Sequence, residues 1–405
     1  MSWEGKCLDE LGTISRGKSK HRPRNDPALY GGIYPFIQTA DVKNANFYIT
    51  EYSQTYNEKG LSQSKLWKKG TLCITIAANI ADTGILGIDA CFPDSIMGFI
   101  PYEDKSDVRY VKYCFDILQK QCQQISQGAT QDNLSWEKLS TIKFPCPPIE
   151  IQKKIAYTLS AYDVLIENNQ KQIKLLEEAA QRLYKEWFVD LRFPGYENTP
   201  IIDGVPQGWE ESIFSDVFDF IRGKSYTSKE LSETEGVLMV NLKNIKSYGG
   251  YKRNAEKRFT GAYKDEQLLV GGDVVMGVTD MTQERRLVGH VALIPSLNEK
   301  MTFSMDLIKL IPYSISKNYL YCALRYGGYS EQIAPLANGV NVLHLKPEAM
   351  MKMKMLVPPK YVIEKFDNQF EAIRLKIEAL EKQCDLAAQA RDRLLPKLMS
   401  GELEV

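Results

Sequence analysis

Two short segments carry residue types that could bind phosphate or a metal ion. Gly12–Ser19 fits the nucleotide-binding pattern G-x-x-x-x-G-K-S, and Pro93-Asp94 followed by Glu103-Asp104-Lys105 resembles the carboxylate pattern of metal-dependent nucleases. A true phosphate loop joins a strand to the N-terminus of a helix, whereas the residues that follow here, Lys20–Arg24, cannot easily begin a regular helix. A nuclease site needs several carboxylates that converge on one ion, and a solvated turn explains this pattern better. We therefore expect neither nucleotide nor metal chemistry.

Other catalytic arrangements are missing from the sequence. The two Pro-Pro pairs, Pro147-Pro148 and Pro358-Pro359, lack the preceding Asn or Asp of an amino-methyltransferase motif, and no Gly-rich strand-to-helix turn for S-adenosylmethionine is present. The three histidines are far apart in the sequence, and none of the eight cysteines forms a CxxC pair. We expect a chain without catalytic residues, metal or disulfides, whose thiols are reduced and mostly buried.

Basic and polar residues instead indicate contacts to nucleic acid. Two basic segments could contact DNA phosphates, although a solvated loop would have the same composition; their residues are Arg16, Lys18, Lys20, Arg22, Arg24, Arg222, Lys224 and Lys229. Side chains that can hydrogen-bond base edges gather mainly in loops after expected strands, where neutral sequence drift is the alternative explanation. These base-reading candidates are Gln38, Thr39, Asn79, Asp82, Thr83, Thr130, Gln131, Asn241, Lys243, Thr279, Asp280, Gln283, Arg285 and Arg286.

The elements that would position these residues occur twice. Trp3 is followed 13 residues later by Arg16-Gly17-Lys18-Ser19, and Trp209 is followed 13 residues later by Arg222-Gly223-Lys224-Ser225. The Pro-Pro pairs recur at an offset of 211, and the same offset relates many residues of the charged segments that follow them. The position of Gly12 is Phe218 in the second copy, so the phosphate-loop pattern does not recur. The chain is thus a tandem duplication of a globular block and a long charged segment.

Both charged segments have apolar residues spaced alternately by four and three, which predicts the seam of a coiled coil. The seam residues are Ile155, Leu159, Tyr162, Ile166, Asn169, Ile173, Leu176, Leu183, Phe366, Phe370, Ile373, Ile377, Leu380 and Leu394, with an interruption at Arg391. The first helix should run from about 149 to 187, and the second should end near Pro396 and Gly401. Asn169 either fixes the register as a buried polar residue or occupies a partly exposed seam position.

The globular blocks, about 1–147 and 196–357, are expected to be mixed α and β. Strand-like runs at Thr71–Ile76 and Asp273–Val278 follow Gly70 and Gly272 at corresponding places. Lys plus Arg and Asp plus Glu both total 51, so the net charge is zero, which suits a chain that binds DNA as part of a larger assembly. No apolar run is long enough to span a membrane and the N-terminus lacks a signal peptide, so a cytoplasmic location is expected.

At this point the sequence resembles the specificity subunits of type I restriction–modification systems over nearly its whole length. The resemblance rests on the alternation of block and helix and on four stretches: Pro23–Gly32 with Pro35–Thr39, Gly128–Leu134, Glu186–Asp190 and Leu394–Leu403. The second block departs from the pattern, because Gly339-Val340-Asn341-Val342-Leu343 replaces the Thr-Gln-x-Asn-Leu motif of the first.

The resemblance implies an α+β fold with a pseudo-two-fold tandem repeat. Two target-recognition domains, 1–147 and 192–357 with its connector, would be separated by spacer helices at 148–191 and 358–405 that pack as an antiparallel coiled coil. The chain would read a split target in double-stranded DNA and dock two adenine methyltransferase subunits and, for restriction, motor-nuclease subunits. Those partners would use S-adenosylmethionine, ATP and Mg²⁺, and this chain would hold none of them. A coiled-coil scaffold that does not read DNA and a nuclease are the alternatives.

Overall fold

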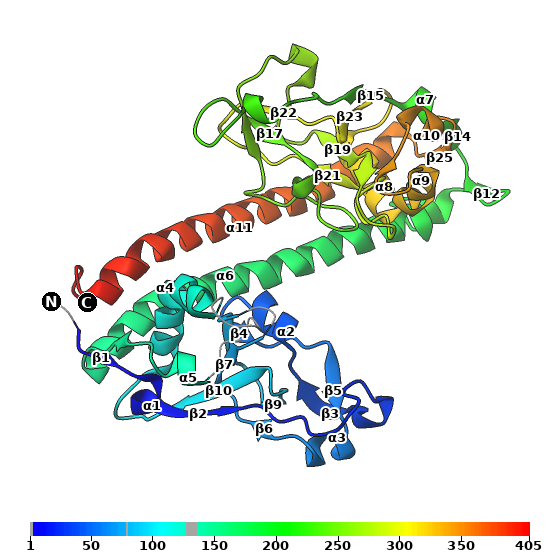
Figure 1. Cartoon of the computed structure of the whole chain (residues 1–405). Coiled ribbons are helices and arrows are strands. Elements are labelled where there is room, and N and C mark those ends of the chain that lie inside the picture. The colour runs from blue at the N-terminus through cyan, green and yellow to red at the C-terminus, as the bar shows by residue number, and fades with distance from the viewer. Residues whose placement is uncertain (1–2, 78–79, 127–135) are drawn as a thin grey trace. The chain divides into compact units, whose positions relative to one another are not determined.

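The computed structural model describes residues 3–77, 80–126 and 136–405. The chain divides into two compact units, of which unit 1 contains residues 1–171 and 381–405 and unit 2 contains residues 172–380 (Figure 1). Each unit therefore includes one globular block together with part of both long helices, α6 (Ile149–Tyr184) and α11 (Lys360–Ser400). The predicted class, two mixed blocks and two long helices, is confirmed, but each helix is shared between the compact units.

Unit 1 is built on a five-stranded sheet in the order β2-β10-β7-β8-β4 and a four-stranded sheet in the order β5-β3-β9-β6. Its strands are β1 (Gly5–Lys6), β2 (Gly12–Arg16), β3 (Tyr30–Phe36), β4 (Tyr48–Ile49), β5 (Gln54–Tyr56), β6 (Leu66–Trp67), β7 (Leu72–Thr75), β8 (Thr83–Leu86), β9 (Ala90–Cys91), β10 (Ile96–Pro101) and β11 (Phe144–Pro145). Its shorter helices are α1 (Leu8–Leu11), η1 (Pro27–Leu29), α2 (Thr39–Asn44), α3 (Glu58–Ser62), α4 (Val108–Ser126) and α5 (Trp136–Leu139).

Unit 2 has two four-stranded sheets, in the orders β15-β23-β19-β21 and β16-β18-β17-β22. The strands are β12 (Ile201–Ile202), β13 (Val205–Pro206), β14 (Glu210–Ile213), β15 (Phe218–Arg222), β16 (Leu231–Ser232), β17 (Val237–Val240), β18 (Lys257–Phe259), β19 (Val274–Gly277), β20 (Thr279–Asp280), β21 (Val291–Leu293), β22 (Met301–Phe303), β23 (Leu307–Pro312), β24 (Leu343–His344) and β25 (Lys354–Val357). The helices are η2 (Lys185–Val189), η3 (Tyr196–Asn198), α7 (Phe214–Val217), η4 (Ser228–Glu230), η5 (Leu242–Asn244), η6 (Asp265–Gln267), α8 (Lys317–Tyr326), α9 (Tyr329–Ile333), η7 (Ala334–Leu336) and α10 (Pro347–Met350).

The duplication seen in the sequence is also a duplication of strand order. The run β2-β10-β7-β8 in unit 1 corresponds to β15-β23-β19-β21 in unit 2, and all neighbours in both runs are antiparallel. The second sheet of each unit contains a parallel pair of strands, β3 with β9 in unit 1 and β17 with β22 in unit 2. The strands expected after Gly70 and Gly272 are β7 and β19, and both glycines have positive φ, at 91° and 84°.

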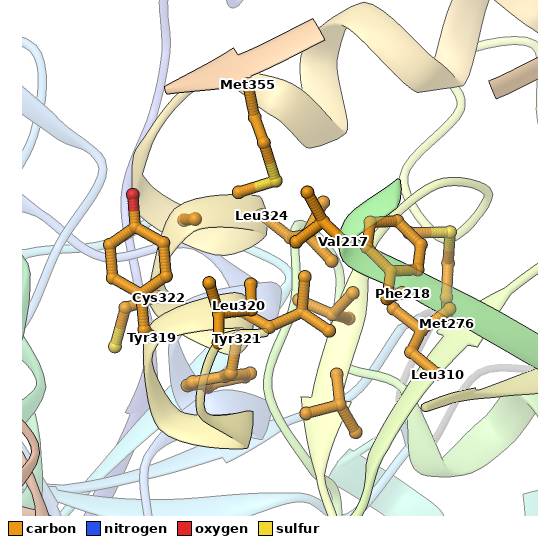
Figure 2. Close-up of a cluster of buried hydrophobic side chains, with 14 of the residues drawn as sticks. Val217, Phe218, Met276, Leu310, Tyr319, Leu320, Tyr321, Cys322, Leu324 and Met355 are labelled. Atoms are coloured by element: carbon orange, nitrogen blue, oxygen red, sulfur yellow. The ribbon is translucent and has the colours of Figure 1, made fainter. Parts of the chain in front are cut away.

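The larger of the two apolar clusters described in unit 2 includes the packing of its first sheet against α8. Ser316 caps this helix by accepting a hydrogen bond from the Tyr319 N–H at 3.0 Å, and six consecutive residues from Tyr319 to Leu324 are buried. Figure 2 shows Leu320 and Leu324 facing Val217, Phe218 and other apolar side chains of the sheet region. This packing holds the strands that carry the candidate site.

Both long helices begin directly after a Pro-Pro pair, as predicted. The first ends in a π-helical turn, η2, in which Asp190 N–H donates to the Lys185 carbonyl at 2.8 Å. Trp187 and Phe188 of this turn are both buried, and Phe188 lies against Phe366 with ring centroids 4.9 Å apart. The wider turn gives the Glu186–Asp190 motif a structural role in unit 2.

The second long helix passes through Pro396 and ends at Ser400. Gly401 follows with a φ of 74°, a left-handed conformation that terminates helices. Leu398 and Met399 are buried in the core of unit 1, and this packing holds the last turn although Pro396 cannot donate a backbone hydrogen bond. The second helix was predicted to end near Pro396 and Gly401, and this is confirmed, because it ends directly before Gly401.

None of the predicted seam residues is exposed, as packing of the seam requires, and their contact with the other helix along its whole length stays a prediction. In unit 1, Asp163 pairs with Arg391, and Asn169 Nδ2 donates to Gln383 Oε1 at 3.2 Å. Rising residue numbers on α6 thus meet falling numbers on α11, so the helices are antiparallel in this unit. Asn169 is 3% exposed, which favours its interpretation as a buried register residue over an exposed seam position.

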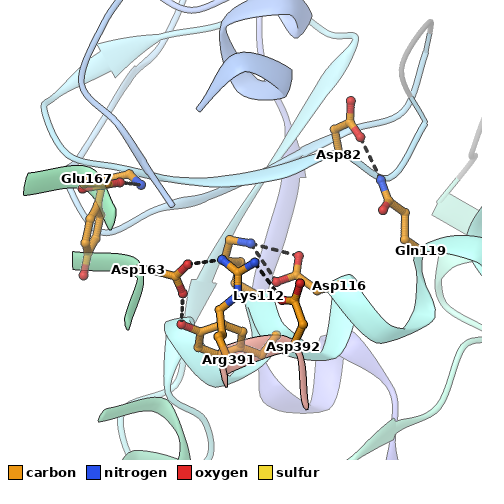
Figure 3. Close-up of polar contacts among 10 residues, drawn as sticks. Asp82, Lys112, Asp116, Gln119, Asp163, Glu167, Arg391 and Asp392 are labelled. Carbon is orange, nitrogen blue, oxygen red and sulfur yellow. Dashed lines mark hydrogen bonds and ion pairs between the residues drawn. The ribbon is translucent and has the colours of Figure 1, made fainter. Parts of the chain in front are cut away.

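An anchoring contact is repeated at the offset of 211. Glu167 Oε1 accepts a hydrogen bond from the Tyr48 backbone N–H at 2.9 Å in unit 1, and Glu378 Oε1 accepts one from the Ser296 N–H at 2.8 Å in unit 2 (Figure 3 shows Glu167). Each long helix therefore holds a globular block by a carboxylate at the same place in the repeat.

The thiols of Cys7, Cys73, Cys91, Cys114, Cys146, Cys322 and Cys384 are free, and most of them are buried. Within the described parts of the chain, no helix combines the length and the apolar character needed to cross a membrane.

Candidate nucleic-acid interface

The two basic segments and the two polar loops leave the sheets at matching edges. In unit 1, β2 and β7 both run antiparallel to β10, so they are parallel to each other and their C-terminal ends lie at one edge of the sheet. In unit 2, β15 and β19 both run antiparallel to β23, so their C-terminal ends also share an edge. In each unit, the basic segment with its candidate phosphate contacts and the polar loop with part of the base-reading candidates therefore begin at the same sheet edge.

The repeated Arg-Gly-Lys-Ser motif is explained by a close approach of two backbones. A Cβ atom on Gly17 would lie 2.3 Å from the Pro93 carbonyl oxygen, and one on Gly223 would lie 2.0 Å from the Ser304 carbonyl oxygen. The next residue pairs with the same neighbouring segment, because Lys18 N–H donates to Phe92 and Lys224 N–H donates to Phe303. Glycine is thus required to direct the basic segment out of the sheet edge in both units.

All five predicted cations of the first segment are exposed. The Gln63 side chain fixes the loop, because its Oε1 accepts the Lys20 and His21 backbone N–H groups at 2.6 and 3.0 Å. Arg22 and Arg24 share the Asp94 carboxylate, at 3.7 and 2.5 Å. Among the described residues, Arg16, Lys18 and Lys20 have no ion-pair partner, which leaves their charges available to an anion.

The corresponding cations of unit 2 differ in exposure and pairing. Arg222 pairs with Glu348 at 2.7 Å, Lys224 is half-buried and Lys229 is exposed.

The polar loop of unit 1 is described only in part. Asp82 is half-buried and accepts a hydrogen bond from Gln119 Nε2 of α4 at 2.8 Å (Figure 3), and burial raises the pKa of this carboxyl group. Thr83 is the first residue of β8, and Thr39 is the first residue of α2. Gln38 is the N-cap of α2, and its Nε2 donates to Gln54 Oε1 at 2.8 Å. The candidates Asn79, Thr130 and Gln131 lie outside the described residues.

The structure corrects three of the base-reading candidates in unit 2. Asp280 is fully buried, and its carboxylate accepts hydrogen bonds from within the loop that follows it. Asn241 is 4% exposed and bonds Asn244 and the backbone, and Thr279 is 7% exposed beside His344. These side chains stabilise the loops and are not available to base edges.

For the remaining candidates of unit 2, the structure leaves the predicted role in base reading open. Lys243, Gln283 and Arg286 are exposed, and Arg285 is half-buried. Gln283 Nε2 donates to the Val340 carbonyl at 2.9 Å, so the loop after β19 contacts the segment that precedes β24. Base reading by these residues stays a prediction.

Two exposed asparagines at this edge were missed in the sequence. Pairing of β20 with β24 places Asn338 and Asn341 beside the loop after β19. The departure of Gly339–Leu343 from the motif of the first block was the available signal, because an exposed loop of changed sequence suits a different half-site.

Neither apparent catalytic motif forms a site. Gly12–Arg16 is itself strand β2, and no helix begins directly after Ser19, so the geometry of a phosphate loop is absent there. Asp94 and Glu103 lie before and after the six-residue strand β10, about 20 Å of extended chain, and Asp94 is paired with Arg24. In the described part of the chain, no group of three His, Cys, Asp or Glu residues could hold a metal ion.

Comparison with known proteins identifies related chains. A family model described as the type I restriction modification DNA specificity domain matches residues 1–178 and 206–382. The MjaIX specificity subunit of a type I restriction enzyme from Methanocaldococcus jannaschii is 27% identical, with 100% of this chain and 94% of the relative covered. The HindI specificity subunit from Haemophilus influenzae is 22% identical over 97% of this chain and 98% of its own length.

A solved structure has the same fold. The crystal structure of the S subunit of a type I restriction-modification system from M. genitalium superposes with a TM-score of 0.63 at 16% identity, covering 98% of this chain and 96% of that chain.

Proposed function

Because the chain belongs to the family of type I restriction–modification specificity subunits, whose members are DNA-recognition components and not catalytic enzymes, we propose that it reads a split DNA target. The matching sheet edges of units 1 and 2 would each read one half of that target. The family membership confirms the predicted recognition role. The two half-sites, the spacer between them and the partner subunits belong to the proposal.

The observation that carries the proposal is the repeated sheet edge. In both units, a glycine-directed basic segment and a polar loop leave the ends of two parallel strands. Exposed cations suit contacts to phosphates, and exposed amide and guanidinium groups suit contacts to base edges. The loops differ in sequence while the strand order is the same, as two readers of different half-sites require.

Exposed apolar residues on the long helices support docking of two copies of one partner. Val164 and Leu375 are related by the offset of 211 and are 43% and 52% exposed. Leu175 and Leu386 are related by the same offset and are 64% and 56% exposed. Within each helix the two residues are 11 positions apart, about three turns, so they lie on one face.

We propose that these faces bind two adenine methyltransferase subunits, and that motor-nuclease subunits join the complex for restriction. The methyltransferases would supply S-adenosylmethionine chemistry, the nuclease subunits would use ATP and Mg²⁺, and the assembly would act on DNA in the cytoplasm. This chain would hold none of these cofactors.

Mapping of N6-methyladenine across the host genome by single-molecule sequencing tests the proposal. The chain is co-expressed with its cognate methyltransferase, and a matched culture expresses the methyltransferase alone. A split motif that is methylated only when this chain is present is the expected result. Identical methylation in both cultures would contradict the recognition role and favour a scaffold.

The length of the long helices should set the length of the unread spacer between the half-sites. Inserting one heptad after Lys171 of α6 and one after Leu380 of α11 keeps the seam and adds about 10 Å of helix to each. The unread spacer should lengthen by up to about three base pairs, at 3.4 Å per base pair, while both half-sites stay the same. The same insertion at Asp203-Gly204 in the exposed β12–β13 turn is the control and should leave the spacer unchanged. Altered half-site bases would argue against a spacer role for the helices.

A further inference from the structure

Unit 2 contains an open groove of about 830 Å³ whose lining is rich in lysine. The cations in its wall are Lys243, Lys246, Lys252 and Lys257. Glu256 is the one acidic residue in the described lining, and its carboxylate already accepts a hydrogen bond from the Tyr251 hydroxyl. In a chain of zero net charge, this groove is a local concentration of positive charge.

The groove adjoins both segments that leave the sheet edge of unit 2. Lys257 Nζ donates to the Tyr226 hydroxyl at 2.5 Å, and Tyr226 belongs to the basic segment after β15. On the other side, the Tyr248 backbone N–H donates to the Arg286 carbonyl at 2.8 Å, and Leu287 forms part of the wall. An anion in the groove would therefore lie beside the predicted DNA-reading loops.

Among the described residues, three of the four ammonium groups have no ion pair, and one of these three, on Lys257, already donates a hydrogen bond to the Tyr226 hydroxyl. Lys243 and Lys252 are exposed, and no described carboxylate pairs with either of them. Lys246 Nζ lies 3.8 Å from Glu177 and its side chain is 41% exposed, so its charge is only partly compensated. No arginine is among the described lining residues, so the groove lacks the planar fork that reads guanine, while lysine acts on phosphate as a flexible point charge.

The corresponding segment of unit 1 has no such charge. Gln38 and Asn241 occupy equivalent N-cap positions after β3 and β17, each of which pairs in parallel with its neighbour. Residues 243–257 contain five basic residues and one acidic residue, whereas residues 40–54 of unit 1 contain one basic residue and two acidic ones. The groove is therefore a feature of the second copy and not of the shared framework.

We propose that this groove binds the phosphate backbone of DNA beside the half-site read by unit 2, so that Lys243, a base-reading candidate from the sequence, contacts phosphate instead of a base. The proposal rests on the proposed function, because it takes the sheet edge of unit 2 as the DNA-facing edge. An acidic protein segment is the competing occupant, and the experiment below separates the two.

The test measures the salt dependence of DNA affinity for the complete complex with its methyltransferase. Binding to fluorescent duplexes, one with the mapped target and one with a scrambled target, is followed between about 50 and 200 mM salt. The double variant Lys243→Ala/Lys252→Ala should reduce the slope of log affinity against log salt by about 1.8, at about 0.9 per phosphate contact. Affinity should fall roughly tenfold for both duplexes, and the target preference should stay the same.

Lys352→Ala is the matched control. Lys352 is also exposed, and it follows Met351, whose carbonyl accepts the Ser215 N–H at 3.1 Å. Ser215 lies just before the start of β15, whereas the groove adjoins the segment after the end of β15. Lys352 is therefore at the opposite end of that strand from the groove. This variant should leave the slope unchanged.

Three outcomes of the groove variant would overturn the proposal. An unchanged slope means that the groove does not contact phosphates, and an unchanged slope with weaker methyltransferase association means that a protein segment occupies it. A lost target preference means that the lysines read bases. Failure of the proposed function is a separate result, because the wild-type complex would then not prefer the target duplex at all.

Discussion

Replacing Arg391 with alanine is expected to lower the stability of unit 1 by about 3 kcal/mol. Its guanidinium pairs with Asp163 (Figure 3), which is 2% exposed. Asp163 also accepts a hydrogen bond from the Tyr113 hydroxyl of α4. Removing the arginine leaves a buried carboxylate without its cation, which costs 3–5 kcal/mol in well-buried pairs. We place the loss at the lower end because the Arg391 side chain is 25% exposed and the Tyr113 hydroxyl remains.

Hydrogen exchange of the backbone amides in α4 and in the first half of α6 measures this loss locally. Arg393→Ala is the control, because Arg393 is exposed on the same helix and should change stability by less than about 0.5 kcal/mol. The double variant Asp163→Leu/Arg391→Leu should be more stable than the sum of its single changes implies, since no unpaired charge remains. Additive effects would show that the two side chains do not stabilise each other.

The duplication shows why this pair could not be read from the sequence. At the offset of 211, Asp163 corresponds to Arg374 and Arg391 corresponds to Ala180, so neither member of the pair recurs. The heptad pattern predicts which residues face a partner helix, but it does not state which residue of that helix each one meets. Arg391 therefore stood out only as an interruption of the seam, and its partner is separated from it by 228 positions.

Periodic and repeated features of the fold were predictable because they rest on local rules. The extent of α6 follows from the Pro-Pro pair and the spacing of its apolar residues, and β7 and β19 follow from apolar runs after glycine turns. The order of the strands was not predictable, because pairing joins segments that are distant in sequence. That order is what places the end of β2 beside the end of β7.

Residue type alone did not separate base-reading side chains from those that build the loop. Asp, Asn and Thr hydrogen-bond base edges, and the same residues hydrogen-bond nearby backbone groups in turns. Asn241 and Asp280 accept hydrogen bonds from nearby backbone N–H groups, while Gln283 and Arg286 remain exposed. Burial distinguishes the two roles, and burial depends on the tertiary fold.

Replacing Asp280 with alanine is expected to abolish target methylation and to destabilise the loop after β19. Its Oδ1 accepts the Thr282 N–H and hydroxyl, both at 2.9 Å, and its Oδ2 accepts the Leu287 and Val288 N–H groups at 2.6 and 3.2 Å. These four bonds close the loop that carries Gln283 and Arg286. Alanine leaves buried donors unsatisfied, and we expect a loss of about 3 kcal/mol for bonds to a charged acceptor.

The pKa of Asp280 gives this prediction a pH dependence. Burial raises the pKa, but the hydrogen bonds from Leu287, Thr282 and Val288 together outweigh burial and leave the pKa below its usual value. A carboxyl group with a lowered folded-state pKa stabilises the fold above its unfolded pKa, about 3.9, and this contribution is lost as the pH falls through the folded pKa. Wild-type unit 2 should therefore lose the contribution of this loop below about pH 4, and the alanine variant should lack that part of the pH dependence.

Methylome mapping and hydrogen exchange of the 281–288 amides measure the two effects in one set of variants. Asp280→Asn should fail nearly as completely, because its amide NH₂ would face backbone N–H groups in place of one acceptor oxygen. Glu284→Ala is the control, since Glu284 is exposed in the same loop and only approaches Arg286 at 3.8 Å, so methylation should persist. Normal methylation by Asp280→Ala with an opened loop would mean that this loop does not read the target, and the exposed asparagines Asn338 and Asn341 would then be the first residues to test at that sheet edge.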